Sequence, residues 1–368
     1  MNRRSFLFGS AAAVLPAAGQ DADATVGTGM IGTGNRGTYL LRTVLDQPGV
    51  RLVALCDTKP DRLDRAATLS ARDQPATMAD YRRLLERRDV QAVFIATPCD
   101  LHVEMAIAAL QAGKHVYCEK PVGITPESIG ELLRVARNAK TVFQAGQQRR
   151  FEPRLRQTIA AIHMGVAGKV LMVKAQRHSG GDLDHNGPSA DWFFNARRSG
   201  DLIVENAVHN LDVCNWAVNS RPERAAGFGG TLLWVNDPPG RTNMDGYSLS
   251  FEYANGVKMS FTQNVFHPRR MPNNNQMIYV YGTKGGADLL DTVMMYPLAR
   301  DAQPALLAEK RQDPPHALIT AFYDCIAKGA PNPADITVGA EAALTSILGH
   351  EAMVREKVVN WSDLGVEL

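Results

Sequence analysis

The chain has 368 residues, of which 45% are hydrophobic and 21% charged, and this composition excludes a disordered or fibrous protein. Its length is sufficient for two domains. With 40 basic and 38 acidic residues the formal charge is only +2, which provides no general attraction to nucleic acid or to an anionic membrane surface, so we expect neither as a partner.

The first twenty residues have the features of an export signal. Arg3 and Arg4 precede a 13-residue apolar stretch, residues 6–18, which is too short for a bilayer span of about 20 residues. The adjacent arginines, followed by Ser-Phe-Leu, resemble a twin-arginine (Tat) signal. We therefore predict a signal peptide over residues 1–20, Tat-dependent export to the periplasm and no membrane insertion after processing. The alternative is a disordered N-terminus on a cytoplasmic protein.

Residues 24 to about 146 alternate short apolar runs with stretches of helical spacing. The predicted strands are residues 24–31, 51–56, 92–97, 115–118 and 141–145. The predicted helices are residues 39–46, 61–70, 81–86, 101–112 and 126–137. Strands that alternate with helices favour a parallel sheet covered on both faces, so we predict an α/β, doubly wound Rossmann domain over residues 21–147.

The pattern changes after residue 147. Helical stretches are predicted over residues 154–163, 201–218, 315–328 and 338–355. Strands are predicted over residues 170–176, 225–234, 247–253, 257–265 and 277–282, with a Gly/Asp/Asn-rich loop at residues 178–200. Neighbouring strands joined by short turns indicate hairpins, so we predict an α+β domain over residues 148–368 with a mostly antiparallel, open sheet.

A glycine motif opens the first predicted helix. Gly32, Gly34 and Gly37 follow a strand with the spacing G-x-G-x-x-G, which permits a tight turn, a close pyrophosphate and a packed helix. Asp57 lies 20 residues beyond Gly37, where its carboxylate can accept hydrogen bonds from an adenosine ribose. It would repel a 2′-phosphate, although Lys59 weakens that preference. We predict NAD as cofactor, with NADP as the alternative.

No metal or disulfide framework is expected. The five cysteines (Cys56, Cys99, Cys118, Cys214, Cys325) are widely spaced in apolar segments and form no C-x-x-C. Residues 182–187 imitate the start of a calcium-binding loop, but Phe193 stands where a bidentate Glu belongs. We therefore predict no metal site.

Two further motifs resemble those of the Gfo/Idh/MocA oxidoreductase family. Residues 96–102 read ATPCDLH, and Glu119-Lys120-Pro121 matches the family's E-K-P motif. Glu205 stands four residues before His209, similar to the acid-and-His signature of the family's second domain. Many family dehydrogenases carry Asp where this chain has Glu205, a departure that puts the substrate class in doubt more than the reaction. The resemblance extends over nearly the whole chain after the leader.

The resemblance implies an NAD(P)-dependent oxidoreductase that transfers a hydride between a nicotinamide and a hydroxyl carbon of a sugar, cyclitol or related polyol. It also implies a homo-oligomer whose second domain binds substrate and provides the interface. The predicted cofactor-binding residues are Gly32, Gly34, Asn35, Arg36, Gly37, Asp57, Thr97, Pro98, His102, Glu119 and Lys120. The predicted substrate-binding residues are Lys120, Trp192, Glu205, His209 and Asp212.

Lys120 and His209 are the predicted reacting pair, with Glu205 as the third catalytic residue. Lys120 can donate a hydrogen bond to the reacting oxygen, or act as a base if burial lowers its pKa. The imidazole of His209 titrates near neutral pH. Glu205, His209 and Asp212 are spaced i, i+4 and i+7, so we expect them on one face of a helix, with Glu205 orienting the imidazole or binding a sugar hydroxyl.

Three interpretations have alternatives. His102 either lies near the cofactor or is a helix-start residue hydrogen-bonded to backbone, and Trp192 either forms a wall under a sugar ring or belongs to an aromatic core. The alternative for the whole protein is a glycosidase that uses tightly bound NAD for transient oxidation and elimination. A non-catalytic dinucleotide-binding protein is the third possibility.

Overall fold

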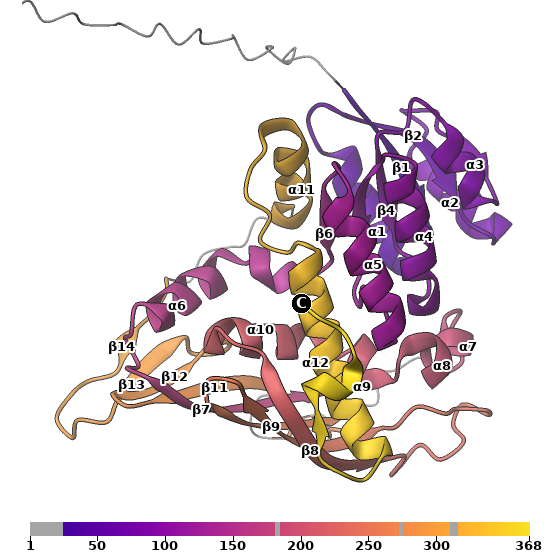
Figure 1. Ribbon diagram of the computed structural model, residues 1–368. Helices are drawn as coiled ribbons and strands as arrows, with labels where there is room; N and C mark the ends of the chain where they lie inside the picture. Colours follow the sequence, from indigo (N-terminus) through magenta and orange to yellow (C-terminus); the bar gives the residue numbers. More distant parts are fainter. Residues whose placement is uncertain (1–24, 181–184, 269, 272–274, 310–315) are drawn as a thin grey trace, which may run out of the picture.

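The computed structural model describes residues 25–180, 185–268, 270–271, 275–309 and 316–368 (Figure 1). The predicted Tat signal lies outside these ranges. Two sheets are present, one in the N-terminal part of the chain and one in the C-terminal part, with helices between and around them. None of the helices within the described ranges is long and apolar enough to pass through a membrane.

The first sheet has six parallel strands in the order β3-β2-β1-β4-β5-β6. They are β1 Val26–Ile31, β2 Val50–Cys56, β3 Ala76–Met78, β4 Ala92–Ile95, β5 His115–Cys118 and β6 Phe143–Ala145. The helices are α1 Asn35–Leu45, α2 Pro60–Leu69, α3 Tyr81–Glu86, the 3-10 turn η1 Cys99–Leu101, α4 His102–Gln111 and α5 Pro126–Asn138. The predicted doubly wound domain is confirmed, and only the short edge strand β3 is an addition.

The second sheet has nine strands in the order β14-β13-β12-β11-β7-β10-β9-β8-β15. Its strands are β7 Val170–His178, β8 Pro222–Gly230, β9 Gly246–Tyr253, β10 Lys258–Asn264, β11 Gln276–Gly282, β12 Gly285–Asp288, β13 Met294–Pro297, β14 Ala305–Leu306 and β15 Val359–Asn360. Only the β7–β10 pair is parallel, so the predicted mostly antiparallel sheet is confirmed.

Helices cover one face of this sheet (Figure 1). The helices of this part of the chain are the 3-10 turn η2 Gln148–Phe151, α6 Pro153–His163, α7 Ala190–Phe193, α8 Ala196–Ser199, α9 Leu202–Glu205, α10 Val208–Val218, α11 Ala317–Lys328, α12 Ile336–Val354 and the 3-10 turn η3 Trp361–Leu364. Of these, α10 and α12 pack directly on the sheet. The alternation along β9 explains the layer, because Tyr247, Leu249 and Phe251 are buried while Ser248 and Ser250 are exposed.

The last helices join the two halves. Helix α12 is apolar around most of its circumference and is buried accordingly. A Cβ on its Gly339 would come within 2.7 Å of Ala145 and Val122, so glycine permits its close approach to the end of the parallel sheet. Helix α11 packs its Phe322 against Phe94 on β4. The chain beyond residue 147 therefore returns to complete the core of the first domain.

Candidate active site

A cavity of about 560 Å³ lies at the carboxyl ends of the parallel strands. This is the edge at which a doubly wound sheet binds its ligands. Its walls include Gly32, Gly34, Asn35, Arg36, Asp57, Thr97, Pro98, His102, Glu119, Lys120, Trp192 and Glu205. The structure thus brings together most of the predicted cofactor residues. Of the predicted substrate residues, Lys120, Trp192 and Glu205 border the cavity, whereas His209 and Asp212 lie outside its walls.

The glycine loop has the geometry of a phosphate cradle. Gly32 has a φ of +88°, which favours glycine, and a Cβ on Gly37 would lie 2.0 Å from the Gly32 carbonyl oxygen. Helix α1 starts at Asn35 without a side-chain cap, so its first N–H groups point at the cavity without a side-chain acceptor. These free donors and the helix dipole fit a pyrophosphate.

Asp57 is held at the end of β2 with its carboxylate at the cavity. Its Oδ2 accepts hydrogen bonds from the backbone N–H of Thr33 at 2.7 Å and from the Thr33 hydroxyl at 3.1 Å. Its Oδ1 accepts from the backbone N–H of Lys59 at 2.9 Å. A carboxylate has about four acceptor positions, so one remains for a ribose hydroxyl. Together with the glycine loop, these residues fit a dinucleotide.

Two glycine substitutions are expected to separate cofactor binding from folding. A Cβ on Gly34 meets only the flexible Arg62 side chain, at 3.4 Å, so Gly34→Ala should fold normally. It should still weaken NAD binding about tenfold or more, because the methyl group stands where the pyrophosphate approaches. Gly37→Ala collides with backbone and should also lower the free energy of unfolding by about 2 kcal/mol. Calorimetric NAD titration and urea unfolding measure both; normal NAD affinity in Gly34→Ala would contradict the cradle.

Glu119 borders the cavity, but its buried carboxylate is occupied by hydrogen bonds within the protein. Its Oε1 accepts from Arg36 Nε at 2.6 Å and from the Tyr117 hydroxyl at 3.0 Å, and its Oε2 accepts from the Lys120 backbone N–H at 3.1 Å. Burial opposes the charge on Arg36, but the paired Glu119 raises the pKa of Arg36 above its usual value. Glu119 therefore ties helix α1 to the backbone that carries Lys120.

His102 borders the cavity and is also hydrogen-bonded to backbone at the start of α4, so both features predicted for it are present. Its ring is buried, with Nδ1 2.7 Å from the Pro121 carbonyl oxygen and Nε2 3.0 Å from the Thr97 carbonyl oxygen. Burial lowers the pKa of His102. The side chain joins the loops that follow β4 and β5, and so it fixes the wall of the cavity through its backbone contacts.

Lys120 connects the two domains. Its Nζ donates to the Glu205 carbonyl oxygen at 2.6 Å and forms a short ion pair with the Glu205 carboxylate. Burial alone would lower the pKa of Lys120, but the charge and hydrogen bond of Glu205 raise it above the ordinary value. Lys120 is therefore a cation at neutral pH, which suits a hydrogen-bond donor rather than a base.

The single helix predicted over residues 201–218 is wrong. The chain forms α9, which ends at Glu205, and α10, which begins at Val208. The Asn206 N–H bonds to the Leu202 carbonyl oxygen as in an α-helix, but the Ala207 N–H bonds to the same oxygen, an i→i−5 contact that widens the turn and interrupts the helix. The predicted common face of Glu205, His209 and Asp212 is therefore lost, and Glu205 binds Lys120 instead of the imidazole.

His209 is a neutral imidazole whose pKa is affected by the charge of Lys120. Burial lowers its pKa well below the usual value, and the positive charges of Lys120, Arg149, Arg36 and Arg177 lower it further. Its Nδ1 lies 3.2 Å from Gln147 Oε1. We assign the ring proton to Nδ1 because Gln147 Oε1 can only accept, and this leaves Nε2 as the acceptor.

Asp212 serves a structural contact instead of substrate binding. Its buried carboxylate forms a forked pair with Arg150, at 2.9 and 3.0 Å from Nε and 2.7 Å from Nη2. Burial raises the pKa of Asp212, and the Arg150 charge opposes that rise. The pair holds α10 against η2. Asp212 therefore has a charged partner within the protein and lies outside the cavity walls, which does not support its predicted substrate role.

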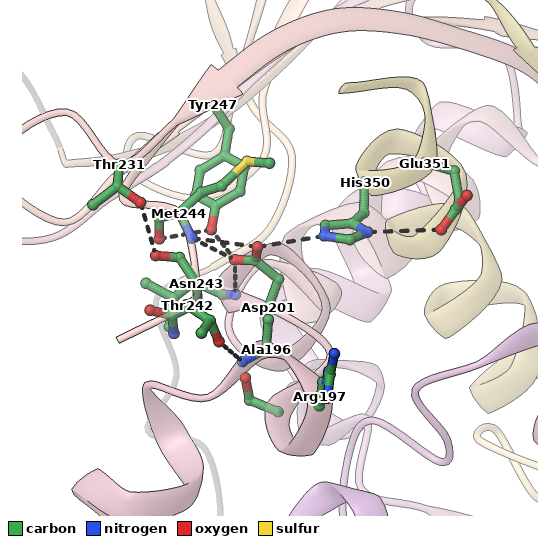
Figure 2. A network of polar contacts seen from close by, with 12 residues as sticks. Ala196, Arg197, Asp201, Thr231, Thr242, Asn243, Met244, Tyr247, His350 and Glu351 are labelled. Atoms are coloured by element: carbon green, nitrogen blue, oxygen red, sulfur yellow. Dashed lines mark hydrogen bonds and ion pairs between the residues drawn. The ribbon is translucent and has the colours of Figure 1, made fainter. Parts of the chain in front are cut away.

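A buried network holds the start of α9, at whose end Glu205 lies (Figure 2). Asp201 caps the helix by accepting from the Leu202 N–H at 2.6 Å, and it also accepts from the Met244 N–H and the Tyr247 hydroxyl. His350 on α12 completes the group, with Nε2 3.4 Å from Asp201 Oδ2. Sequence reasoning missed this network because its members are far apart along the chain.

The protein should become less stable between about pH 6.5 and 9 through His350. Burial opposes protonation, but Asp201 and Glu351 raise the pKa of His350 to about 9. Because the pKa is higher in the folded than in the unfolded protein, protonated His350 stabilises the fold fully below the unfolded pKa near 6.5. This contribution to stability is lost as the pH rises through 9. The loss is about 3 kcal/mol at most. Urea unfolding measures the free energy of unfolding across this pH range. Its dependence on pH should flatten in His350→Gln but not in His163→Gln, a change at an exposed histidine. Equal pH dependence in the two variants would contradict the assignment.

Within the part of the chain that the structure describes, no three His, Cys, Asp or Glu side chains are grouped to hold a metal ion. The predicted absence of a metal site at residues 182–187 falls partly outside the described residues.

Trp192 lies at the cavity wall with its ring against Phe193, at a centroid distance of 5.7 Å. Residues 188–193 thus cover the cavity from the second domain.

Two family profiles match successive parts of the chain. Residues 26–147 match the sequence profile of the "Oxidoreductase family, NAD-binding Rossmann fold", and residues 155–288 match that of the "GFO/IDH/MocA C-terminal domain". The two matches lie in one chain in the family's order, and their junction falls between the parallel and the antiparallel sheet. They confirm the predicted NAD-binding family.

Individual relatives cover different parts of the chain. An inositol 2-dehydrogenase of Rhizobium meliloti is 27% identical over 263 residues, 71% of this chain and 74% of that protein. A glycosyl hydrolase family 109 protein of Saccharopolyspora erythraea is 33% identical over 178 residues, 45% of this chain and 39% of the relative. The solved levoglucosan dehydrogenase complex with NADH and L-sorbose has a TM-score of 0.79 at 21% identity, covering 93% of this chain and all of that one; this likeness concerns the fold.

Proposed function

Because the chain belongs to the GFO/IDH/MocA oxidoreductase family, we propose that it transfers a hydride between NAD and a hydroxyl-bearing carbon of a sugar, cyclitol or related polyol. One observation carries this proposal. Lys120, at the edge of the dinucleotide cavity, is held by Glu205 of the second domain beside the neutral His209. The names of the inositol and levoglucosan dehydrogenase relatives support the substrate class.

The residues divide the chemistry between them. The glycine loop and Asp57 would hold NAD, which would supply the hydride acceptor. The Lys120 ammonium donates a hydrogen bond to the substrate oxygen and stabilises the negative charge that develops there. His209 Nε2 accepts the hydroxyl proton, while Gln147 holds the opposite ring nitrogen. Glu205 keeps Lys120 charged and in place.

The first test is NAD reduction by the purified protein. We expect absorbance at 340 nm to rise with at least one member of a panel of aldoses, cyclitols, anhydrosugars and sugar acids. NADP should be the poorer acceptor, since the Asp57 carboxylate in the cavity wall would repel a 2′-phosphate. A protein that binds NAD by calorimetry but reduces none with the whole panel would contradict the dehydrogenase.

The glycosyl hydrolase relative favours one second candidate, a glycosidase that uses tightly bound NAD. Its signature is different, because the cofactor is oxidised again at the end of each cycle. Incubation with aryl glycosides would release the phenol without net NADH. Release of phenol by wild-type protein, lost in Lys120→Met, would replace the dehydrogenase proposal with this one.

We also propose export by the Tat route and assembly into a homo-oligomer. The paired Arg3 and Arg4 support export, and replacement of both by lysine should leave the protein in the cytoplasm on cell fractionation.

The outer face of the second sheet supports assembly, since it exposes Met172 and Tyr281 on neighbouring strands β7 and β11. Light scattering measures the oligomer, and a monomer at micromolar concentration would contradict it.

A further inference from the structure

Two arginines beside His209 have only neutral hydrogen-bond partners among the described residues. Arg149 Nη2 donates to the Gln276 side-chain oxygen at 2.7 Å. Arg177 Nε donates to the Asn206 side-chain oxygen at 2.9 Å. Each guanidinium has five N–H donors, so most of the donors on both side chains remain for a ligand.

The neighbouring cations Arg36, Lys120 and Arg150 each have a buried or nearly buried carboxylate partner. Arg36 pairs with Glu119, Lys120 with Glu205, and Arg150 with Asp212. These three pairs cancel, and the neutral His209 adds no charge. Among these five cations, the positive charges without a carboxylate partner are therefore those of Arg149 and Arg177.

Contacts of the two arginines link them to each other and to the segment that carries Glu205. Arg177 is on the face of β7 that also carries the buried Val173 and Ala175, and its partner Asn206 directly follows Glu205. In the β7–β11 ladder Arg177 stands opposite Gln276, the partner of Arg149. The positive charges of both arginines reach His209, since both lower the pKa of its imidazole.

Holding these two charges together is unfavourable without an anion. Both side chains are partly buried, and burial together with the charge of Arg149 lowers the pKa of Arg177. A carboxylate between them would offset both effects, because guanidinium forks match its two oxygens with paired, charge-assisted hydrogen bonds. A neutral polyol would leave the like charges uncompensated.

We propose that the substrate is a sugar acid, whose carboxylate binds between Arg149 and Arg177 while a hydroxyl carbon lies beside Lys120 and His209. This inference rests on the proposed function and narrows its substrate class. The carboxylate is bound by the second domain, so it fixes which hydroxyl reaches the reacting lysine. Neutral sugars lack this contact and are the poorer substrates.

The test compares acids with their uncharged amides at the same site. Calorimetry on the NAD-saturated protein is run with D-glucuronate, D-galacturonate and D-gluconate, each beside its amide. At least one acid should bind about tenfold to a hundredfold more tightly than its amide, since charge-assisted hydrogen bonds are lost in the amide. Arg149→Gln and Arg177→Gln should each remove that preference, Arg177→Lys should keep part of it, and Arg156→Gln, at an exposed arginine of α6, should keep all of it.

Reduction of NAD is followed in parallel, so the two proposals fail separately. Acid binding that requires both arginines but yields no NADH upholds the anion site and overturns the dehydrogenase. NADH formation from neutral sugars, with equal affinity for acid and amide, overturns the anion site and leaves the dehydrogenase. Binding of D-glucose 6-phosphate but of no carboxylate overturns the assignment to sugar acids, as does the absence of binding by every acid.

Discussion

Lys120→Met is expected to lower kcat by about a thousandfold while leaving the affinity for NAD within a factor of a few. Methionine retains the length of the side chain but cannot donate to the substrate oxygen. The loss should fall on kcat and kcat/KM together, because the interaction strengthens as negative charge develops on that oxygen. Lys174→Met, on the outer face of β7, is the matched control and should behave as wild type.

The Glu205→Gln variant tells why Lys120 works at neutral pH. Without the carboxylate, the largest effect that opposes burial is lost, so the pKa of Lys120 falls although the charge of Glu119 still favours the ammonium. Wild-type activity should then show no alkaline loss up to about pH 10, whereas in Glu205→Gln the loss should begin at a lower pH. Steady-state rates between pH 7 and 10 measure this limb. Identical profiles, or a Lys120→Met variant with wild-type kcat, would remove Lys120 from the chemistry.

Much of the first domain followed from local patterns. Buried parallel strands read as apolar runs, and Gly32, Gly34 and Gly37 mark the strand-to-helix turn that those runs require. Asp57 follows the next parallel strand, so its position at the same edge of the sheet as the glycine loop could also be predicted. The edge strand β3 escaped notice because three residues carry too little periodicity to predict a strand.

The second domain shows what spacing alone cannot decide. The spacing of Glu205, His209 and Asp212 is helical, but the widened turn at Ala207 separates α9 from α10, and the three side chains bind different partners. Choice among partners depends on residues distant in sequence, such as Lys120 and Arg150. The adjacent arginines at 149 and 150 look equivalent in sequence, yet only Arg150 meets a buried carboxylate.

The structure also assigns separate tasks to residues that sequence reasoning grouped. Glu119 and His102 border the cavity, but their polar atoms are occupied by Arg36, Tyr117 and backbone. They position the loop that carries Lys120. The groups free to act on a substrate are therefore fewer: the Lys120 ammonium, the His209 imidazole and the unpaired arginines. This division is why the lysine and histidine substitutions should have the largest effects.

His209→Asn is expected to lower kcat about a hundredfold to a thousandfold, because asparagine is too weak a base to accept the hydroxyl proton. The pH profile tests the same role. A base must be neutral, and the lowered pKa of His209 keeps it neutral well below pH 6.5, so wild-type activity should be flat above that pH and fall only in more acidic solution.

Gln147→Glu is the decisive companion variant. A carboxylate 3.2 Å from Nδ1 would favour the imidazolium and raise the pKa of His209. The acid limb of the rate profile should therefore move toward neutral pH, with little change on the plateau, while His163→Asn leaves the profile unchanged. An acid limb that stays in place in Gln147→Glu, together with a His209→Asn variant of wild-type kcat, would assign the proton to another acceptor and leave His209 as a buried structural residue.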